Sequence, residues 1–362
     1  MNEQELVLQF DIEGAISSIE PFGSGHINNS FKVATESANS PDYFLQQVNH
    51  QVFHDIPGMM KNIWFISEHI RKKDLQNTDQ NVEQEHMEVI KTKKGELFFI
   101  DSNGAYWRMF VFKTGLHSYD LVESPEQAYE GGKAFGTFLS LLSDFPHENL
   151  SITIPDFNNL YFRLGQLEDA VKNDSLGRVI EVKNELDFVQ THAKQMCQIE
   201  DLKNSRAIPI RTTHNDTKFN NVLLDGQGIG RCVIDLDTVM PGVVHYDFGD
   251  GIRSSTACTV EDEPDLSQVD FDIDKFEGFT AGYLAATKHI LTKTEKEYLA
   301  LSGALFPFMI GLRFLTDYIS GDKYFKIGRE KHNLDRARCQ LKMSEKILNR
   351  LDELNKIVSK NY

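Results

Sequence analysis

The sequence predicts an α+β fold with a small, strand-rich N-terminal lobe and a larger, mostly helical C-terminal lobe. Short β-rich runs separated by turn-forming residues fill the first hundred or so positions, and apolar residues recur at helical spacing from about residue 116. One β-hairpin pattern interrupts the helical part. A chain of 362 residues is typical of about two domains, and we expect them to cover residues 1–110 and 111–362.

The strands of the first lobe are predicted from extended runs that end at turns. "ISSIEPFGSGHINNSFKVATE" contains two such runs joined by a Gly/Asn/Ser turn, and residues 42–48 form another after the loop "SANSP". "KKGELFFIDSNGAYWRMFVFK" is typical of two strands around the turn "DSNG". One helix is predicted between these strands, from the apolar face Met59, Ile63, Ile66 and Ile70.

Helices dominate the second lobe. The first is predicted to begin with a capping box, with Ser124 as N-cap, Pro125 at the first helical position and Gln127 at the third. The apolar run 301–315 is too short to span a bilayer and is typical of a buried helix. Further helical patterns cover residues 158–172, 182–199, 272–319 and 334–359, whereas 204–250 is typical of strands and loops.

Composition excludes several classes of function. With 40% hydrophobic and 25% charged residues, the chain is typical of a soluble protein with no membrane partner. The net charge of −16 disfavours nucleic-acid binding, because phosphate polyanions would be repelled. The four cysteines show no CxxC spacing, and the N-terminus lacks the basic and apolar regions of a signal peptide. We therefore expect a cytoplasmic protein without a zinc site or disulfides.

The stretch "HNDTKFNNVLLDGQGIGRCVIDLD" (214–237) contains the predicted hairpin. "NVLLD" and "RCVID" are β-rich runs that flank the turn "GQGIG". Symmetric pairing would place Asn221 opposite Asp235 and Asp225 opposite Arg231, with Cα atoms about 4.5–5.5 Å apart. An amide oxygen and a carboxylate side by side are suitable ligands for Mg²⁺. Asn221 and Asp235 are therefore the candidate metal ligands.

Asp216 lies five residues before Asn221, on the loop that enters the hairpin. The spacing H-x-D-x-x-x-x-N is that of kinase catalytic loops, in which the Asp contacts the acceptor hydroxyl and the Asn binds Mg²⁺. The alternative is a polar loop whose Asp and Asn side chains only cap turns. The paired Asp235 and the two-lobe layout favour a phosphotransferase, with Asp216 as the catalytic residue.

At these residues the chain resembles the aminoglycoside phosphotransferase / choline kinase superfamily, most closely its N-acetylhexosamine 1-kinases. The resemblance rests on "HNDTKFNNVLLD", "VIDLDTVMPG", "HYDFGD", "FGSGHINNSFKV", "YFLQQVN" and "FMIGLRFLTDYISGDKYFKI", in this family's order and over nearly the whole chain. It implies a bilobal protein-kinase-like fold, ATP as donor and Mg²⁺ as cofactor. The implied reaction phosphorylates the anomeric hydroxyl of GlcNAc or GalNAc to the sugar 1-phosphate.

The same resemblance implies that His26, Arg313 and Tyr324 bind the sugar. Arg313 offers several donors for hydroxyls or an acetamide carbonyl, and Tyr324 offers a ring face and a hydroxyl. The alternative is that Arg313 pairs with an acid on the helix surface and Tyr324 only packs. Other acceptors also stay open: choline would require an aromatic cage, aminoglycosides an acidic cleft, and homoserine or another sugar would use the same fold. A catalytically silent nucleotide-binding module is the remaining alternative.

The candidate nucleotide-binding residues depart from the protein-kinase pattern at two positions. Gly23 and Gly25 match the start of a glycine-rich loop, but Asn28 stands where a third glycine is usual. Gln46 occupies the β3 position of the phosphate-binding lysine, which leaves phosphate neutralisation to Mg²⁺, to backbone N–H groups or to another base such as Lys32.

Two further aspartates follow the hairpin. Asp247 belongs to "DFG", but it lies beyond the hairpin, and the resemblance implies a structural carboxylate that supports the catalytic loop. Asp237, two residues after Asp235, is expected to cap the next turn rather than to bind the metal.

Overall fold

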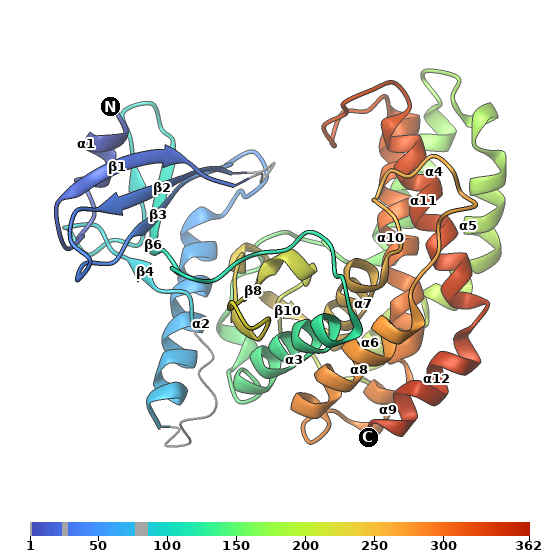
Figure 1. The fold of residues 1–362 in the computed structure, drawn as a ribbon. Helices are drawn as coiled ribbons and strands as arrows, with labels where there is room; N and C mark the ends of the chain where they lie inside the picture. Colours follow the sequence, from blue (N-terminus) through green and yellow to red (C-terminus); the bar gives the residue numbers. More distant parts are fainter. Residues whose placement is uncertain (1, 24–27, 77–85) are drawn as a thin grey trace. The chain divides into compact units, whose positions relative to one another are not determined.

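The computed structural model describes residues 2–23, 28–76 and 86–362. The chain divides into two compact units. The sheet unit consists of Met1–Ser118, Leu141–Pro155 and Asn221–Pro241, and the helical unit of Tyr119–Ser140, Asp156–Asn220 and Gly242–Tyr362. The predicted α+β class, with an antiparallel N-terminal sheet and many helices, is confirmed (Figure 1).

An antiparallel sheet, with six strands among the described residues, forms the centre of the sheet unit. The strand order is β1-β2-β3-β6-β4, and β5 also pairs with β6. The predicted runs all form strands, namely β1 (Ile16–Pro21), β2 (Asn29–Thr35), β3 (Tyr43–Val48), β5 (Phe99–Ile100) and β6 (Tyr106–Val111). The short strand β4 (Val89–Ile90) was not predicted. Because successive side chains of a strand point to opposite faces, Leu45 and Gln46 of β3 lie on different faces.

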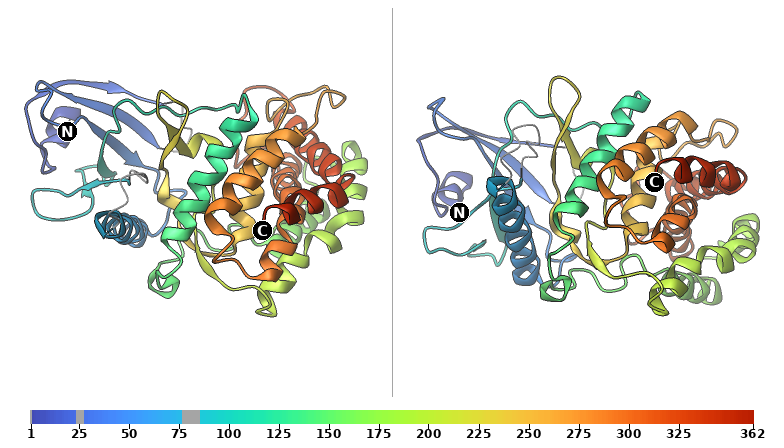
Figure 2. Two further views of the ribbon diagram at one scale, coloured as in Figure 1. Left: turned by 60° about the horizontal axis from the view of Figure 1, so that its bottom comes forward. Right: turned by 90° about the horizontal axis from the view of Figure 1, so that it is seen from below.

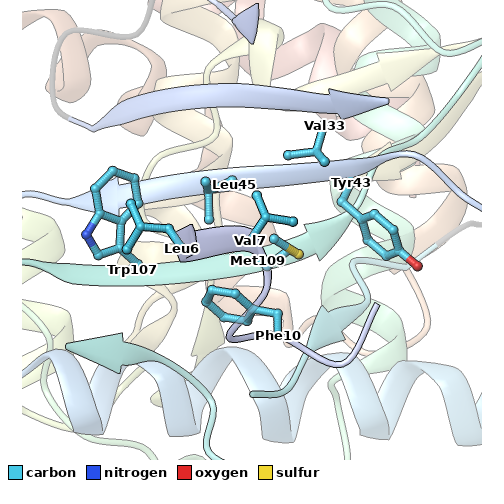
Figure 3. Packing of buried hydrophobic residues seen from close by; sticks show 8 residues of the cluster. All are labelled: Leu6, Val7, Phe10, Val33, Tyr43, Leu45, Trp107 and Met109. Atoms are coloured by element: carbon cyan, nitrogen blue, oxygen red, sulfur yellow. The ribbon is translucent and has the colours of Figure 1, made fainter. Parts of the chain in front are cut away.

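One face of this sheet is apolar. Residues of the short helix α1 (Glu3–Val7) and the following turn pack against alternate residues of β2, β3 and β6, as Figure 3 shows. The cluster comprises Leu6, Val7, Phe10, Val33, Tyr43, Leu45, Trp107 and Met109. Helix α2 (Ile56–Gln76) lies beside β4 and buries the predicted face of Met59, Ile63, Ile66 and Ile70. The opposite sheet face therefore carries Gln46 and its polar neighbours.

The predicted hairpin also belongs to the sheet unit, as β8 (Val222–Leu224) and β9 (Gly230–Val233). The predicted register is wrong by one residue, because Val222 pairs with Val233 and an irregularity follows Leu223. Such a bulge places two residues of one strand opposite one of the other. Asn221 therefore lies opposite Ile234, whose N–H donates to its carbonyl oxygen at 2.9 Å, and Asp235 is the next residue along.

The helical unit is a bundle around α10 (Leu299–Ser320), as Figures 1 and 2 show. Helix α10 packs against α4, α7 and α11. It is the one described helix long and apolar enough to cross a membrane, but 83% of its most apolar window is buried in the protein, as in a core helix. The other main helices are α3 (Pro125–Leu141), α4 (Leu160–Asn173), α5 (Lys183–Met196), α6 (Gln198–Asn204), α7 (Val244–Thr256), α8 (Ile273–Thr287), α9 (Lys293–Glu297), α11 (His332–Leu348) and α12 (Leu351–Lys360).

The N-terminus of α3 differs in one detail from the predicted capping box. The backbone N–H of Gln127 donates to the Ser124 hydroxyl at 3.2 Å, as expected. The Gln127 side chain, however, accepts from the N–H of Glu123 at 2.7 Å rather than from that of Ser124. The helix start is thus predicted correctly, while the reciprocal bond lies one residue earlier.

Candidate active site

In the helical unit, strand β7 (Arg211–Thr213) leads into the loop that carries Asp216. The buried Asp247 carboxylate, on the first turn of α7, accepts from the backbone N–H groups of His214 at 2.9 Å and Asn215 at 2.7 Å. Thr217 in turn donates its hydroxyl to the Asp247 carbonyl oxygen at 2.5 Å. The predicted role of Asp247 as a structural carboxylate beneath this loop is confirmed.

Burial has the largest effect on the pKa of the Asp247 carboxyl. It raises the pKa of this carboxyl from 3.8 to about 7, although the two N–H donors from His214 and Asn215 oppose the rise. Asn215 has a positive φ of 66°, an uncommon conformation for a residue with a side chain. The carboxylate of Asp247 stabilises this tight turn by satisfying two backbone donors that would otherwise be buried unpaired.

Asp216 faces a cation that the sequence analysis did not identify. The Lys218 ammonium lies 3.1 Å from Oδ1 of Asp216. Burial alone raises the pKa of Asp216, but the positive charges of Lys218, His214 and Arg253 together hold it below its ordinary value. Asp216 is therefore ionised at neutral pH. The signal for Lys218 was its position two residues after Asp216 in the same motif.

A second buried acid–base pair lies on α7, near this carboxylate. Arg253 and Asp250, one helical turn apart, form an ion pair with a distance of 2.7 Å between Nη2 and Oδ1. Burial raises the pKa of Asp250, against the charge of Arg253, and the negative charge of Asp216 raises it further. Acidic and basic side chains of the helical unit thus act on one another around Asp216. Each charge is at least partly offset by an opposite charge.

Arg313 and Tyr324, the predicted sugar-binding residues, lie together in the helical unit. The Arg313 guanidinium lies 5.3–5.9 Å from the ring centroids of Phe157, Tyr324 and Phe325. Among the described residues no carboxylate is within ion-pair distance of Arg313, so the alternative of a surface ion pair is wrong. The negative charge of Asp216 nevertheless acts on Arg313, which places the two groups in one electrostatic neighbourhood.

The segment that carries Tyr324 is fixed by the buried Asp317 of α10. Its Oδ1 accepts from the N–H groups of Lys323 and Tyr324, both at 2.9 Å, and its Oδ2 from that of Phe325 at 2.9 Å. Asn333 adds a side-chain donor at 3.0 Å. The Tyr324 side chain is 64% exposed. Its backbone is thus held firmly while its ring stays open to a ligand.

The candidate metal ligands lie at one end of the hairpin in the sheet unit. Asp235 follows the bond between Ile234 and Asn221, and its φ of 60° and ψ of 55° turn the chain into a short 3₁₀ helix, Leu236–Thr238. Carboxylate and amide oxygens fit Mg²⁺. No group of three or more His, Cys, Asp or Glu residues in the described part of the chain could hold a metal ion.

Asp237 does not have the turn-capping role expected from the sequence. It forms a buried ion pair with Arg108 of β6, with Nη1–Oδ1 and Nη2–Oδ2 distances of 2.5 and 2.9 Å. Asn28 donates its side-chain amide to the same carboxylate at 3.2 Å. Gln46 accepts from Nε of Arg108 at 3.0 Å. Sequence reasoning missed Arg108, because nothing near it in the chain marks it.

The remaining predicted nucleotide-binding residues lie around the polar sheet face or outside the described part of the chain. Lys32 forms an ion pair with Asp42 at 3.1 Å, and its ammonium lies 4.6 Å from the ring centroid of Phe112. Gly23 has the positive φ of 86° that suits a glycine turn. Gly25 and His26 lie outside the described residues.

Comparison with known proteins agrees with this fold. The model of the phosphotransferase enzyme family (APH) matches residues 18–281. An aminoglycoside phosphotransferase from Alicyclobacillus acidocaldarius subsp. acidocaldarius has a similar structure, with a TM-score of 0.67 and 13% identity over 99% of this chain and 97% of that one. A microcompartment-associated aminopropanol kinase gives 0.58 and 14%, over 97% of each chain. A spectinomycin phosphotransferase in complex with ADP and spectinomycin gives 0.51 and 13%, also over 97% of each.

At these identities the likeness concerns the fold, whereas the family model concerns the sequence itself. The matched residues include the whole loop and hairpin from His214 to Asp237. The chain therefore belongs to the phosphotransferase enzyme family (APH).

Proposed function

We propose that this protein is an ATP- and Mg²⁺-dependent kinase that phosphorylates the anomeric hydroxyl of an N-acetylhexosamine, GlcNAc or GalNAc, in the cytoplasm. Residues 1–110 would form the nucleotide-binding lobe and residues 111–362 the catalytic and acceptor-binding lobe. ATP as donor is supported by the family and by the ADP in the spectinomycin phosphotransferase complex. The hexosamine as acceptor is supported by the sequence resemblance and by the surroundings of Arg313.

Asp216 acts on the acceptor in this proposal. Its carboxylate accepts a hydrogen bond from the anomeric hydroxyl and aligns that oxygen with the γ-phosphorus. The new bond joins the sugar oxygen to phosphorus, the bond to the β,γ-bridging oxygen breaks, and ADP leaves. A carboxylate with a lowered pKa is a weak base. It therefore orients the hydroxyl and receives the proton late, as a loose phosphoryl-transfer transition state allows.

Asn221 and Asp235 would hold the magnesium ion through their side-chain oxygens. A bound Mg²⁺ neutralises charge on the nucleotide phosphates. Gly23, Gly25, Asn28, Lys32 and Gln46 remain the proposed nucleotide-binding residues.

The observation that carries the acceptor assignment is the guanidinium of Arg313 among three aromatic rings, without a carboxylate partner in the described part of the chain. A choline-type acceptor would need such rings for its own ammonium group. Here they surround a cation of the protein, which would repel an amine. A neutral acceptor with hydroxyl and carbonyl oxygens, such as an acetamido sugar, gives Arg313 acceptors for its N–H groups.

Arg163 strengthens this argument. It donates from Nη2 to the carbonyl oxygen of Phe157 at 2.8 Å, and the ring of the same residue lies against Arg313. Burial, together with the charge of Arg313, lowers the pKa of Arg163 to about 10, which still leaves it protonated at neutral pH. Phe157 thus contacts two guanidinium groups, that of Arg163 through its carbonyl oxygen and that of Arg313 through its ring. These positive charges would disfavour a cationic acceptor in the proposed acceptor site. His26, the third proposed sugar-binding residue, lies outside the described residues.

A panel of acceptors tests the proposal. Purified protein with ATP and Mg²⁺ is offered GlcNAc, GalNAc, glucose, choline, homoserine and an aminoglycoside, and release of ADP is measured. We expect turnover with the acetamido sugars and a product whose ³¹P–¹H coupling locates the phosphate at C1. Turnover with choline or an aminoglycoside only would refute the acceptor assignment. No turnover with any acceptor, while ATP still binds, would support a catalytically silent module.

An Arg313 variant separates binding of the sugar from the fold. Arg313→Met keeps a long apolar chain among the rings but removes every donor, so we expect the KM for the sugar to rise by roughly tenfold or more. The KM for ATP should stay within about twofold, because Arg313 is not among the proposed nucleotide-binding residues. Arg336→Met serves as a control, since Arg336 also lies over a ring, that of Phe314, but is not a predicted sugar-binding residue.

A further inference from the structure

The buried pair formed by Arg108 and Asp237 joins segments far apart in the sheet unit. Arg108 lies on β6 and is 1% exposed, and Asp237 lies in the turn after Asp235 and is 3% exposed. The two-bond geometry uses both terminal nitrogens of the guanidinium. Such a bidentate pair fixes orientation as well as distance. Arg108 thereby attaches the proposed metal-binding turn to the sheet.

The rest of the guanidinium is held by β3. Gln46 lies directly across from Arg108 in the ladder, and its Oε1 accepts from Nε at 3.0 Å and from Nη2 at 2.8 Å. Its Nε2 donates to the hydroxyl of Ser30 at 3.0 Å. A lysine at position 46 would place an ammonium group against the guanidinium, and like charges at this distance repel. The glutamine is therefore the complement of Arg108 rather than a lost lysine.

The turn that carries Asp235 needs such support. Asp235 has a left-handed backbone, which costs a residue with a side chain roughly 1 kcal/mol or more. The turn is held before Asp235 by the bond from Ile234 to Asn221. After Asp235 it is held by the Arg108–Asp237 pair and by Asn62 of α2, whose amide donates to the carbonyl oxygen of Val239 at 2.9 Å.

We infer that Arg108 is a positioning residue, which fixes the orientation of the Asp235 carboxylate toward a nucleotide-bound divalent metal through its buried pair with Asp237. The inference rests on the proposed metal-binding role of Asp235, and it does not depend on which acceptor is phosphorylated. Because its own charge is used by Asp237, Arg108 contributes to nucleotide binding through the metal and not by contacting phosphate.

Calorimetry with ADP, in excess Mg²⁺ and separately in EDTA, tests this inference. The ratio of the two affinities measures the metal-dependent part of nucleotide binding. In the Asp237→Asn variant, which keeps the shape of the side chain but not its charge, we expect this ratio to fall by roughly tenfold or more. Affinity in EDTA should change by less than about twofold.

The hairpin β8–β9 that precedes this turn offers a control pair. Arg231 pairs with Asp225 at 2.8 Å, near the tip and away from Asp235. Arg231→Met removes an arginine–aspartate pair from the hairpin without touching the proposed metal-binding turn. We expect the ratio of its ADP affinities in Mg²⁺ and in EDTA to equal that of the wild type. An equal loss in both control and test variants would overturn the inference, because it would indicate general loosening of the hairpin.

A double variant covers the case in which a single change destabilises the fold. Arg108→Met with Asp237→Leu replaces the buried charges by apolar groups, a change that proteins often tolerate. Folding is checked by thermal unfolding. A folded double variant with a lowered ratio supports the inference, and one with the wild-type ratio overturns it. So does equal weakening in Mg²⁺ and EDTA, which would indicate direct contact with the nucleotide.

The outcomes separate this inference from the proposed function. If wild-type protein shows no gain in ADP affinity on adding Mg²⁺, both the metal assignment and the inference fail. If the Mg²⁺/EDTA affinity ratio falls in Asp237→Asn as expected but acetamido sugars are not phosphorylated, the inference stands. Only the acceptor assignment then fails.

Discussion

The Lys218 ammonium lies 3.1 Å from the carboxylate of Asp216, two residues away on the same loop. The Lys218 side chain is 46% exposed, so it can also contact a ligand. A cation at this position can stabilise charge on a transferring phosphoryl group.

We expect Lys218→Met to lower kcat by roughly 10²-fold, because one donor aimed at the developing charge is lost. Lys218 holds the pKa of Asp216 down, so its removal raises that pKa. The acidic limb of the pH–kcat profile, where activity falls as Asp216 is protonated, should then move to higher pH. Lys218→Arg keeps the charge and should leave the limb near its wild-type position. If the acidic limb of the pH–kcat profile does not shift in Lys218→Met, protonation of Asp216 is not the cause of that limb.

Asp216→Asn should abolish turnover while nucleotide binding persists. The amide keeps the size of the side chain but cannot accept a proton, and such groups contribute about 10²–10⁴-fold to rates. The measurements are ADP release at saturating substrates and the dissociation constant of ADP. Asp225→Asn, at the hairpin tip, is the control with the same chemical change. A rate within about tenfold of wild type would rule out the proposed role of Asp216.

Asp247 should make stability depend on pH. Its pKa of about 7 in the folded protein is above the ordinary value of 3.8. The folded state therefore binds this proton more tightly than the unfolded state. The stabilisation is complete below about pH 4 and is lost as pH rises through 7.

Urea unfolding of wild type and Asp247→Asn at intervals of pH tests this dependence. The asparagine cannot ionise, so the free energy of unfolding of wild type relative to the variant should fall by about 2–3 kcal/mol between pH 5 and 8. Curves that run parallel over this range would contradict the raised pKa. The Asn variant should also lose activity, because its NH₂ group faces one of the two backbone donors of the loop.

Asp317→Asn should weaken acceptor binding without changing nucleotide binding. The two carboxylate oxygens each serve two donors around residues 323–325 and Asn333. An amide can serve only one of these pairs, so the segment with Tyr324 loosens. We expect the acceptor KM to rise by roughly tenfold, with the ATP KM within about twofold.

The control for this variant is Lys331→Met. Lys331 pairs with Glu181 at 2.6 Å on the surface of the same unit, where an exposed pair contributes little. Its steady-state parameters should match those of wild type. A rise in the KM for ATP in Asp317→Asn, equal to the rise for the acceptor, would indicate a general loss of structure instead of a local one.

Much of the fold could be predicted from local patterns. The apolar face of α2, the strands of the sheet and the start of α3 follow from periodicity and capping residues, which act over a few positions. The hairpin was predicted correctly, but its register was wrong by one residue, because an irregularity after Leu223 shifts the pairing. A bulge depends on twist and packing, to which the alternation of residue types is insensitive.

The partners of charged groups were predicted less well. Asp247 was placed correctly through the resemblance, whereas Asp237 was expected to cap a turn and instead pairs with Arg108. Lys218 was within the recognised motif but received no role. Arg163 and Asp317 were not singled out, because an arginine or aspartate on a helix looks the same whether it faces solvent or a neighbouring segment.

The sequence by itself determined the α+β class, the family, and the clustering of Asp216, Asn221 and Asp235 on one short segment, since these depend on residues close together in the chain. Only the tertiary structure decided that Gln46 accepts hydrogen bonds from Arg108 and that Arg108 in turn holds Asp237. These residues lie 62 and 129 positions apart. Contacts over such separations form only when packing brings the segments together, and burial then makes each unpaired charge so costly that it must find a partner.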